Sequence, residues 1–198
     1  PDGAHLRSWS DWPWTEIDLM VISPGIAHAY PAPHLAAKLA AKHNVKVVSE
    51  IEIAMLAKLA ARIVGITGTN GKSTTTALVG HCLEAAGIAV GVGGNIGDAA
   101  CQMNDPGPDG VIVLELSSYQ LETTPSLRTD VSVVLNISPD HLDRHCGMDG
   151  YVAAKAQILR ALGGRGLAIL GEGDAYVRSL AAAQATGGQS VQIARSSD

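Results

Sequence analysis

The residues with the clearest chemistry in this sequence form a short loop rich in glycine and hydroxyl side chains. The loop consists of Gly68, Thr69, Asn70, Gly71, Lys72, Ser73 and Thr74. It follows an apolar run typical of a strand and precedes a helical pattern, which is where backbone N–H groups, a Lys and a hydroxyl hold nucleotide phosphates and Mg²⁺. The spacing departs from GxxxxGK[ST], because Ile66 stands where the first glycine would be. The strand-loop-helix context nevertheless predicts a phosphate-binding loop.

An acidic residue ends a second apolar run. Residues 111–114 are all aliphatic, and Glu115 follows them. In a doubly wound sheet this strand would lie beside the one before the phosphate loop, and its end would point the carboxylate at the ligand crevice. Mg²⁺ commonly takes one or two carboxylates together with substrate phosphates. We therefore expect Glu115 to be a Mg²⁺ ligand, and the alternative is a solvated strand end.

A third apolar run leads into a dense polar cluster at residues 136–145. His141 and His145 could form an i, i+4 pair on a helix that binds a transition metal, but no HExxH pattern supports a catalytic zinc. We favour His141 beside Mg²⁺ or phosphate, with His145 as a solvated neighbour. Lys155 follows on an otherwise apolar helical stretch. A snorkelling surface Lys is the simpler interpretation, whereas its nearness to the cluster favours a role in the site.

Two further loops carry weaker signals. The glycines of residues 91–97 could let a ligand approach the backbone closely, or they could form a plain turn. Ser23, Pro24 and Gly25 offer N–H groups near a strand end, although a turn alone explains them equally.

Short apolar runs alternate with helical patterns, which predicts an α/β fold with a parallel sheet and crossover helices. Strands are expected at 18–23, 45–48, 63–67, 88–92, 111–116, 131–135 and 167–170. Helices are expected at 32–43, 50–60, 72–86, 150–162 and 174–185. The helix at 50–60 is apolar on more than one face, which suits packing between two domains, so we place the domain boundary near residues 60–62.

Composition excludes several classes of protein. The chain is 46% hydrophobic and 17% charged, as globular domains are, and its formal charge of −5 leaves no basic excess for nucleic acid or anionic lipid. Its three cysteines, Cys82, Cys101 and Cys146, lack a CxxC spacing, so neither a disulfide framework nor structural zinc is indicated, and a cytoplasmic location is expected. No apolar run approaches the roughly 20 residues that span a bilayer, so no membrane partner is expected.

Together these motifs resemble the Mur ligase family, ATP-dependent enzymes that form amide bonds in peptidoglycan precursor synthesis. The resemblance runs from about residue 18 to 170. The strings GGNIG at 93–97 and ELSSYQLE at 115–122 resemble the branch that adds D-glutamate to UDP-N-acetylmuramoyl-L-alanine through an acyl phosphate. The resemblance implies an ATP-binding central domain, truncated, at residues 61–198. Before it, residues 1–60 would be the end of a Rossmann-like domain for the UDP substrate, and the C-terminal ligase domain would be absent.

The resemblance also implies roles for single residues. Lys72 and Ser73 would hold the ATP phosphates and one Mg²⁺, with Glu115 as a ligand of that ion. His141 would support a second Mg²⁺, and Lys155 would be carbamylated and ligate the same metal. Lys72, His141 and Lys155 would thus be catalytic. The residues implied near the UDP-sugar substrate are Asn95, Ser117 and Gln120, and the loop Ser23, Pro24 and Gly25 at the uridine end.

Three alternatives stay open at this point. Another Mur or folylpolyglutamate-type ligase would share the loop, whereas a P-loop module without ligation chemistry would leave the Asp140, His141 and Lys155 cluster without purpose. The third alternative is that the chain is a degraded or mispredicted polypeptide without activity of its own.

The chain also departs from the family pattern at two places. Cys146 stands where the family usually has Gly, and residues 171–174 replace an Asn-containing turn, so the residues that would bind adenine stay unassigned. We expect a monomer that alone binds nucleotide weakly and does not complete ligation.

Overall fold

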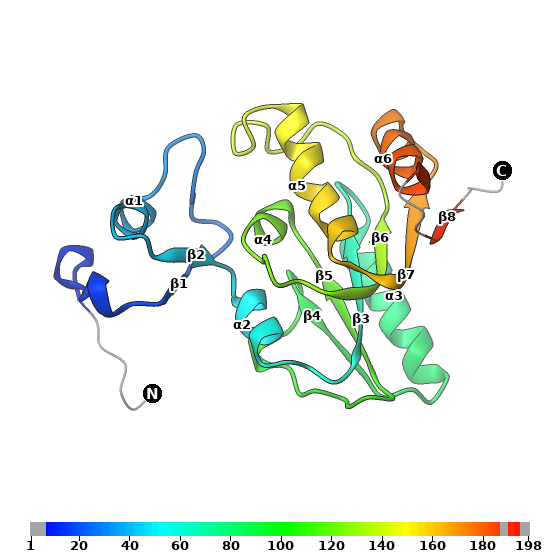
Figure 1. The fold of residues 1–198 in the computed structure, drawn as a ribbon. Coiled ribbons are helices and arrows are strands. Elements are labelled where there is room, and N and C mark those ends of the chain that lie inside the picture. The colour runs from blue at the N-terminus through cyan, green and yellow to red at the C-terminus, as the bar shows by residue number, and fades with distance from the viewer. Residues whose placement is uncertain (1–6, 187–189, 195–198) are drawn as a thin grey trace.

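The main element of the fold is a six-stranded sheet with the order β4-β5-β3-β6-β7-β8 (Figure 1). The structure, a computed structural model, describes residues 7–186 and 190–194. The strands are β3 (Arg62–Thr67), β4 (Val90–Gly94), β5 (Val111–Glu115), β6 (Thr129–Val134), β7 (Leu162–Gly171) and β8 (Ser190–Ala194). Every neighbouring pair is parallel, which confirms the predicted α/β class. All five residues of β5 are buried, as expected of an aliphatic run in a sheet covered on both faces.

Helices cover the sheet unequally. The helices are α2 (Glu50–Leu56), α3 (Lys72–Ala85), α4 (Ser118–Glu122), α5 (Met148–Arg160) and α6 (Ala175–Thr186). Side chains of α2, α4, α5 and α6 share the largest hydrophobic cluster with strand residues such as Ile112 and Leu114. On the other face, Val79 and Leu83 of α3 pack against a smaller cluster around Ile66.

A smaller unit precedes this sheet. It consists of β1 (Leu19–Val21), β2 (Lys46–Val48), α1 (Leu35–Lys42) and two 3₁₀ turns at Trp9–Asp11 and Trp14–Glu16. The two strands pair in parallel and have a core of their own. The predicted boundary near residues 60–62 lies beyond α2, although Ile51 and Ala54 of α2 belong to the core of the large sheet.

Several predicted elements differ at their ends. The helix expected from residue 32 begins at Leu35, because the His34 ring accepts a hydrogen bond from the Ala36 N–H at 3.2 Å and caps it. The short helix α4, the 3₁₀ turn at Ala100–Gln102 and strand β8 were not predicted from the sequence. On α3, two apolar side chains face outward: Leu78 is 58% exposed and Cys82 is exposed. Thr76 and Gly80 are the buried residues of this helix, since glycine allows close approach to Val92.

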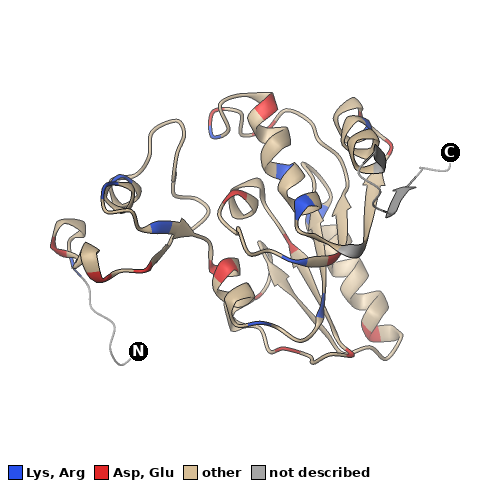
Figure 2. Cartoon of the chain, in the orientation of Figure 1, with Lys and Arg blue, Asp and Glu red and all other residues tan. Residues whose placement is uncertain are grey.

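Acidic and basic residues are interspersed over both units (Figure 2). Within residues 7–186 and 190–194, no helix is long and apolar enough to cross a bilayer.

Ile158 and Leu78 are buried to different extents, which predicts different losses of stability when each is replaced by Ala. Ile158 is fully buried in the main core, so Ile158→Ala should lower the free energy of unfolding by about 2–5 kcal/mol. Leu78→Ala is the matched control at an exposed position and should change it by no more than about 0.5 kcal/mol. Urea denaturation followed by circular dichroism measures both. Equal losses in the two variants would contradict this placement of the core.

Candidate active site

The candidate site lies where the carboxyl ends of three parallel strands meet. Strand β3 is central: the chain continues from it to β4 and β5 on one side and then to β6 on the other. Such a change of direction is the usual place for a ligand crevice in an open α/β sheet. Glu115 of β5 pairs in register with Ile66 of β3, which confirms that this carboxylate lies beside the phosphate-loop strand.

The loop at residues 68–74 has the backbone geometry that an anion needs. Gly71 caps α3 with a φ of 79°, a left-handed conformation that favours glycine. A Cβ on Gly68 would lie 3.0 Å from the Cβ of Leu135, so a side chain there would push the two strand ends apart. The Lys72 Nζ donates to the Thr69 carbonyl oxygen at 2.9 Å. The first N–H groups of α3 have no partner within the helix and can bind phosphate oxygens.

Asn136 holds this loop in place. Its Oδ1 accepts from the backbone N–H groups of Thr69 at 3.1 Å and Asn70 at 2.8 Å, and its Nδ2 donates to the Asn70 carbonyl at 3.0 Å. Sequence reasoning gave Asn136 no role. The available signal was its position directly after the strand that neighbours the phosphate-loop strand.

The Thr69 hydroxyl connects the loop to α5. It contacts the Tyr151 hydroxyl at 3.1 Å, and it accepts from the Ser138 N–H at 3.0 Å. The side chain of Thr69 is therefore engaged within the protein, whereas Ser73 and Thr74 are exposed on the first turn of α3.

Glu115 is buried, with 1% of its surface exposed. The alternative of a solvated strand end is therefore wrong. Its Oε1 accepts from the Asn95 Nδ2 at 2.9 Å, and its Oε2 is buried without a hydrogen-bond partner. A buried carboxylate oxygen without a partner is costly, so this residue fits a cation that would satisfy it. Across the described ranges, no three His, Cys, Asp or Glu side chains form a metal cluster, so a Mg²⁺ ion here would need hydroxyl and phosphate oxygens as further ligands.

Lys155 is also buried, with 1% exposed, so the interpretation as a surface lysine is wrong. Its Nζ donates to the Gly68 carbonyl at 2.7 Å and to the Thr67 hydroxyl at 3.5 Å. Burial lowers the pKa of Lys155 to about 7; the charge of Lys72 acts in the same direction, and Asp140 opposes it. A substantial fraction of this amine is thus uncharged near neutral pH.

The lowered pKa of Lys155 predicts how stability depends on pH. Between about pH 7 and the ordinary pKa of 10.5, the unfolded chain binds a proton that the folded chain does not, so Lys155 makes the free energy of unfolding rise with pH. From pH 7 to 9.5 this rise is on the order of 3 kcal/mol. Lys155→Met should remove it, as measured by urea denaturation in buffer purged of CO₂. An unchanged slope in the variant would show that Lys155 titrates normally.

A cavity of about 140 Å³ brings many of these side chains together. It is lined by Lys72, Asn95, Ser117, Ser118, Tyr119, Asp140, His141, Tyr151 and Lys155. Of the predicted site residues, five therefore share one cavity: Lys72, Asn95, Ser117, His141 and Lys155.

Two groups of predicted substrate residues lie outside the lining of this cavity. Gln120 accepts from the Ser117 N–H at 3.0 Å and donates to Glu50 Oε1 at 3.1 Å, so its side chain caps α4 and ties it to α2. The loop of Ser23, Pro24 and Gly25 is linked to the site by Arg144. The Arg144 guanidinium donates to the Gly25 carbonyl at 3.2 Å and lies 4.5 Å from the ring centroid of Tyr119, which lines the cavity.

The two histidines of the polar cluster have different surroundings. No helix joins them, because residues 141–147 form turns. His141, with a positive φ of 49°, has a side chain 54% exposed and lies 3.5 Å from an Asp140 carboxylate oxygen. The prediction of His145 as a solvated neighbour is wrong, since only 3% of it is exposed. The turns fold it back so that its ring stacks on Tyr119 at 5.2 Å between centroids.

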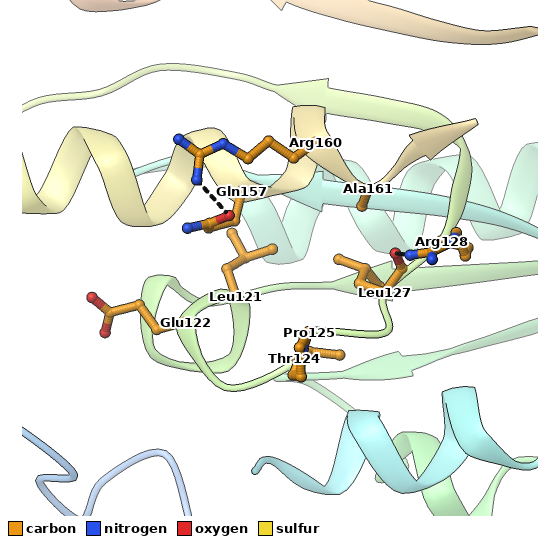
Figure 3. Close-up of a pocket in the computed structure, with 9 residues that line it drawn as sticks. All are labelled: Leu121, Glu122, Thr124, Pro125, Leu127, Arg128, Gln157, Arg160 and Ala161. Atoms are coloured by element: carbon orange, nitrogen blue, oxygen red, sulfur yellow. Dashed lines mark hydrogen bonds between the residues drawn. The ribbon is translucent and has the colours of Figure 1, made fainter. Parts of the chain in front are cut away.

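A second hollow, of about 210 Å³, lies between residues 121–128 and the end of α5 (Figure 3). Its two arginines do not face a common point in the hollow. Arg160 donates to Gln157 Oε1 at 3.1 Å, and Arg128 donates to the Leu127 carbonyl at 2.8 Å. Figure 3 shows their guanidinium groups at different ends of the hollow. None of the predicted site residues lines it.

Comparison with known proteins identifies the family of this chain. The family described as Mur ligase middle domain matches residues 66–197, a stretch that contains every residue lining the 140 Å³ cavity. This chain belongs to the Mur ligase family. Its predicted resemblance is confirmed, and the glycine-rich loop at residues 68–74 lies within the matched stretch.

Curated relatives point to one branch of the Mur ligases. The UDP-N-acetylmuramoylalanine–D-glutamate ligase of Paramagnetospirillum magneticum is 46% identical over 180 residues, covering 91% of this chain and 39% of that protein. The ligase of the same name from Rhodospirillum rubrum is 51% identical over 158 residues, covering 80% and 33%. The chain thus spans between a third and two fifths of the length of these relatives.

Solved structures confirm the fold of this Mur ligase chain. The UDP-N-acetylmuramate:L-alanyl-gamma-D-glutamyl-meso-diaminopimelate ligase from Neisseria meningitides matches with a TM-score of 0.59 at 18% identity, over 90% of this chain and 58% of that one. MurF from Acinetobacter baumannii matches with a TM-score of 0.57 at 18% identity, over 82% and 36%.

Proposed function

We propose that this chain is the nucleotide-binding part of an ATP-dependent ligase that adds D-glutamate to UDP-N-acetylmuramoyl-L-alanine in peptidoglycan precursor synthesis. One observation carries the proposal: Lys72, His141 and Lys155 line one cavity with Asn95, the partner of the buried Glu115. The two relatives at 46% and 51% identity, both named as D-glutamate ligases, support this branch over other ligases.

The chemistry is phosphoryl transfer from ATP to the substrate carboxylate, followed by attack of the D-glutamate amine on the resulting acyl phosphate. Both steps concentrate negative charge, so positioned cations and N–H donors supply most of the catalysis. Lys72 and the first N–H groups of α3 bind and orient the phosphates. Asn136 keeps the loop in the conformation that presents these groups.

Two Mg²⁺ ions would neutralise phosphate and carboxylate oxygens when bound. Ser73 and Glu115 would hold the first, since the buried Oε2 of Glu115 lacks any other partner. His141 and a carbamylated Lys155 would hold the second.

Carbamylation of Lys155 is chemically favoured by its surroundings. The uncharged amine attacks CO₂, an N–C bond forms, and one amine proton is released, so a cation becomes an anionic oxygen ligand. Burial lowers the pKa of Lys155 to about 7, which keeps the nucleophilic form available near neutral pH. Intact-mass measurement with and without bicarbonate tests this step.

We assign the UDP-sugar to the part of the same cavity that contains Asn95 and Ser117. Asn95 and Ser117 line it and would contact the substrate. Gln120 would act by fixing Ser117 at the start of α4. Ser23, Pro24 and Gly25, held by Arg144, would contact the uridine end.

The compartment and assembly are proposed as a cytoplasmic monomer. The three cysteines are free in the structure, which suits a reducing compartment. Size-exclusion chromatography with light scattering tests the monomer.

The experiment that tests the ligase uses a chimera. This chain replaces the corresponding region of the Paramagnetospirillum magneticum relative, and ADP release is measured with each substrate alone and with both. The proposal predicts ADP release that requires UDP-N-acetylmuramoyl-L-alanine and D-glutamate together. Release without either would favour a P-loop module, and a requirement for another amino acid or a folate would favour a different ligase. The unaltered relative is the control.

A further inference from the structure

Three side chains that the proposed ligation does not use form a hydrogen-bonded series beside the cavity. The Ser118 Oγ lies 2.8 Å from the His145 Nε2, and the His145 Nδ1 lies 3.2 Å from the Glu122 Oε1. A hydroxyl, an imidazole and a carboxylate at these separations are the signature of a nucleophile, its base and the group that orients the base.

The position of Ser118 in the fold suits a nucleophile. Strand β5 ends at Glu115, and Ser118 opens α4 three residues later, at the carboxyl end of a parallel strand inside the sheet. Hydrolases of the α/β class present their nucleophilic serine on the same kind of strand-turn-helix, although the GxSxG spacing is absent here. Ser118 lines the 140 Å³ cavity and is only 3% exposed, so it can be reached by small groups alone.

The His145 imidazole is held in one orientation. It is fully buried between Tyr119, on which it stacks with an interplanar angle of 10°, and Tyr151, at 5.3 Å between centroids. Because an ionised Glu122 can only accept, the Nδ1 carries the hydrogen and the Nε2 lone pair faces the Ser118 hydroxyl. The arrangement therefore has the tautomer that a general base requires.

We propose that Ser118 is a nucleophile that accepts small activated acyl groups, with His145 as its base and Glu122 as the positioning residue. The Ser118 Oγ attacks the acyl carbonyl carbon while its proton passes to the His145 Nε2. The bond to the leaving group breaks, and the leaving group departs with that proton. Water then attacks the acyl-serine, His145 again accepts and returns a proton, and the carboxylic acid is released. Lys72, in the same cavity, supplies positive charge for the oxyanion.

The test uses the 198-residue chain with p-nitrophenyl acetate, an activated ester that delivers the small acetyl group, and it does not depend on the proposed ligation. Nitrophenolate release is followed in time, and peptide mass mapping locates the acetyl group. We expect a burst, acetyl on Ser118, and loss of the burst in Ser118→Ala. Glu122→Ala should slow acetylation of Ser118 at least about 10-fold, which is less than the roughly 10²–10⁴-fold that a general base itself contributes, because Glu122 only positions that base. Glu122→Gln retains an acceptor for the Nδ1 hydrogen and should restore much of the rate.

A matched control separates this role of Glu122 from its contact with His28. The His28 Nε2 lies 3.6 Å from the Glu122 Oε2, so His28→Ala removes that contact and leaves the series intact. Its acetylation rate should equal that of the wild type. His145→Gln should slow acetylation as Glu122→Ala does, with circular dichroism as the check on folding. If His145→Gln does not fold, Glu122→Ala decides, because that side chain is partly exposed and tolerates truncation.

Three outcomes would overturn the proposal. They are acetyl on the amine of Lys72 or Lys155 in place of Ser118, an unchanged rate in folded Glu122→Ala, and the absence of acetylation. The first would make the cavity lysines the reactive groups, and the last two would make the series a purely structural link between α4 and the turn that contains His145.

Discussion

Lys72→Ala weakens the binding of Mg²⁺-ATP to this chain by roughly 10- to 100-fold. The estimate follows from losing hydrogen bonds between a cation and phosphate oxygens, which are worth about 1.5–3 kcal/mol where one partner is charged. Lys72 is the lysine of the phosphate loop, it lines the cavity, and its Nζ already lies over the loop at 2.9 Å from the Thr69 carbonyl. Isothermal titration calorimetry measures the two affinities.

The control for Lys72→Ala is Lys42→Ala, an exposed lysine on α1 in the smaller unit. It removes the same charge from the chain and should leave the affinity unchanged. Equal affinities of Lys72→Ala and wild type would show that the loop does not bind the phosphates. Binding by neither would show that the chain needs further parts of the protein to bind nucleotide.

The second large effect is expected from Glu115→Gln, which should abolish most of the contribution of Mg²⁺ to nucleotide binding. Gln keeps the shape and an acceptor for the Asn95 Nδ2, but it puts an NH₂ group or a neutral oxygen where a cation would meet the charged Oε2. We expect the gain in ATP affinity on adding Mg²⁺ to fall about 10-fold or more, consistent with the loss of one charged ligand. ATP binding without Mg²⁺ should change little. Titrations with and without Mg²⁺ separate the two.

Glu84→Gln on the exposed side of α3 provides the control for Glu115→Gln, since it makes the same chemical change at the surface. Its Mg²⁺ dependence should match that of the wild type. A full Mg²⁺ effect in Glu115→Gln would rule out this carboxylate as a ligand, and the orphaned Oε2 would then need another partner.

Much of the fold could be predicted because its signals are local. The phosphate loop has glycine, Lys and hydroxyl residues within seven consecutive positions, and Gly71 has the left-handed φ that such a turn needs. The aliphatic runs before Gly68 and Glu115 predicted neighbouring parallel strands, and their register brings Glu115 beside Ile66. Element ends were less accurate, as with Leu35, since a capping contact decides where a helix begins.

Other features depended on residues far apart in the chain. The hydrogen bonds between Asn136 and Asn70 join residues 66 positions apart in the sequence. The hydrogen bond from Lys155 to the Gly68 carbonyl joins residues 87 positions apart. Periodicity cannot show such pairs, so Asn136 was missed and Lys155 had two open interpretations. The same holds for Gln120, whose amide closes a cap and contacts α2 from 70 positions away.

The sequence by itself determined the strand-loop-helix around residues 68–74, the parallel strands and the family, because these depend on residue types at short spacing. Only the tertiary structure decided which ionisable groups lose contact with water. It buried Glu115 with one oxygen unpartnered, lowered the pKa of Lys155, and turned His145 from an expected surface residue into the centre of a buried series. The physical reason is that solvation and charge interaction depend on everything packed around a side chain, and that surrounding is assembled from distant segments only when the chain folds.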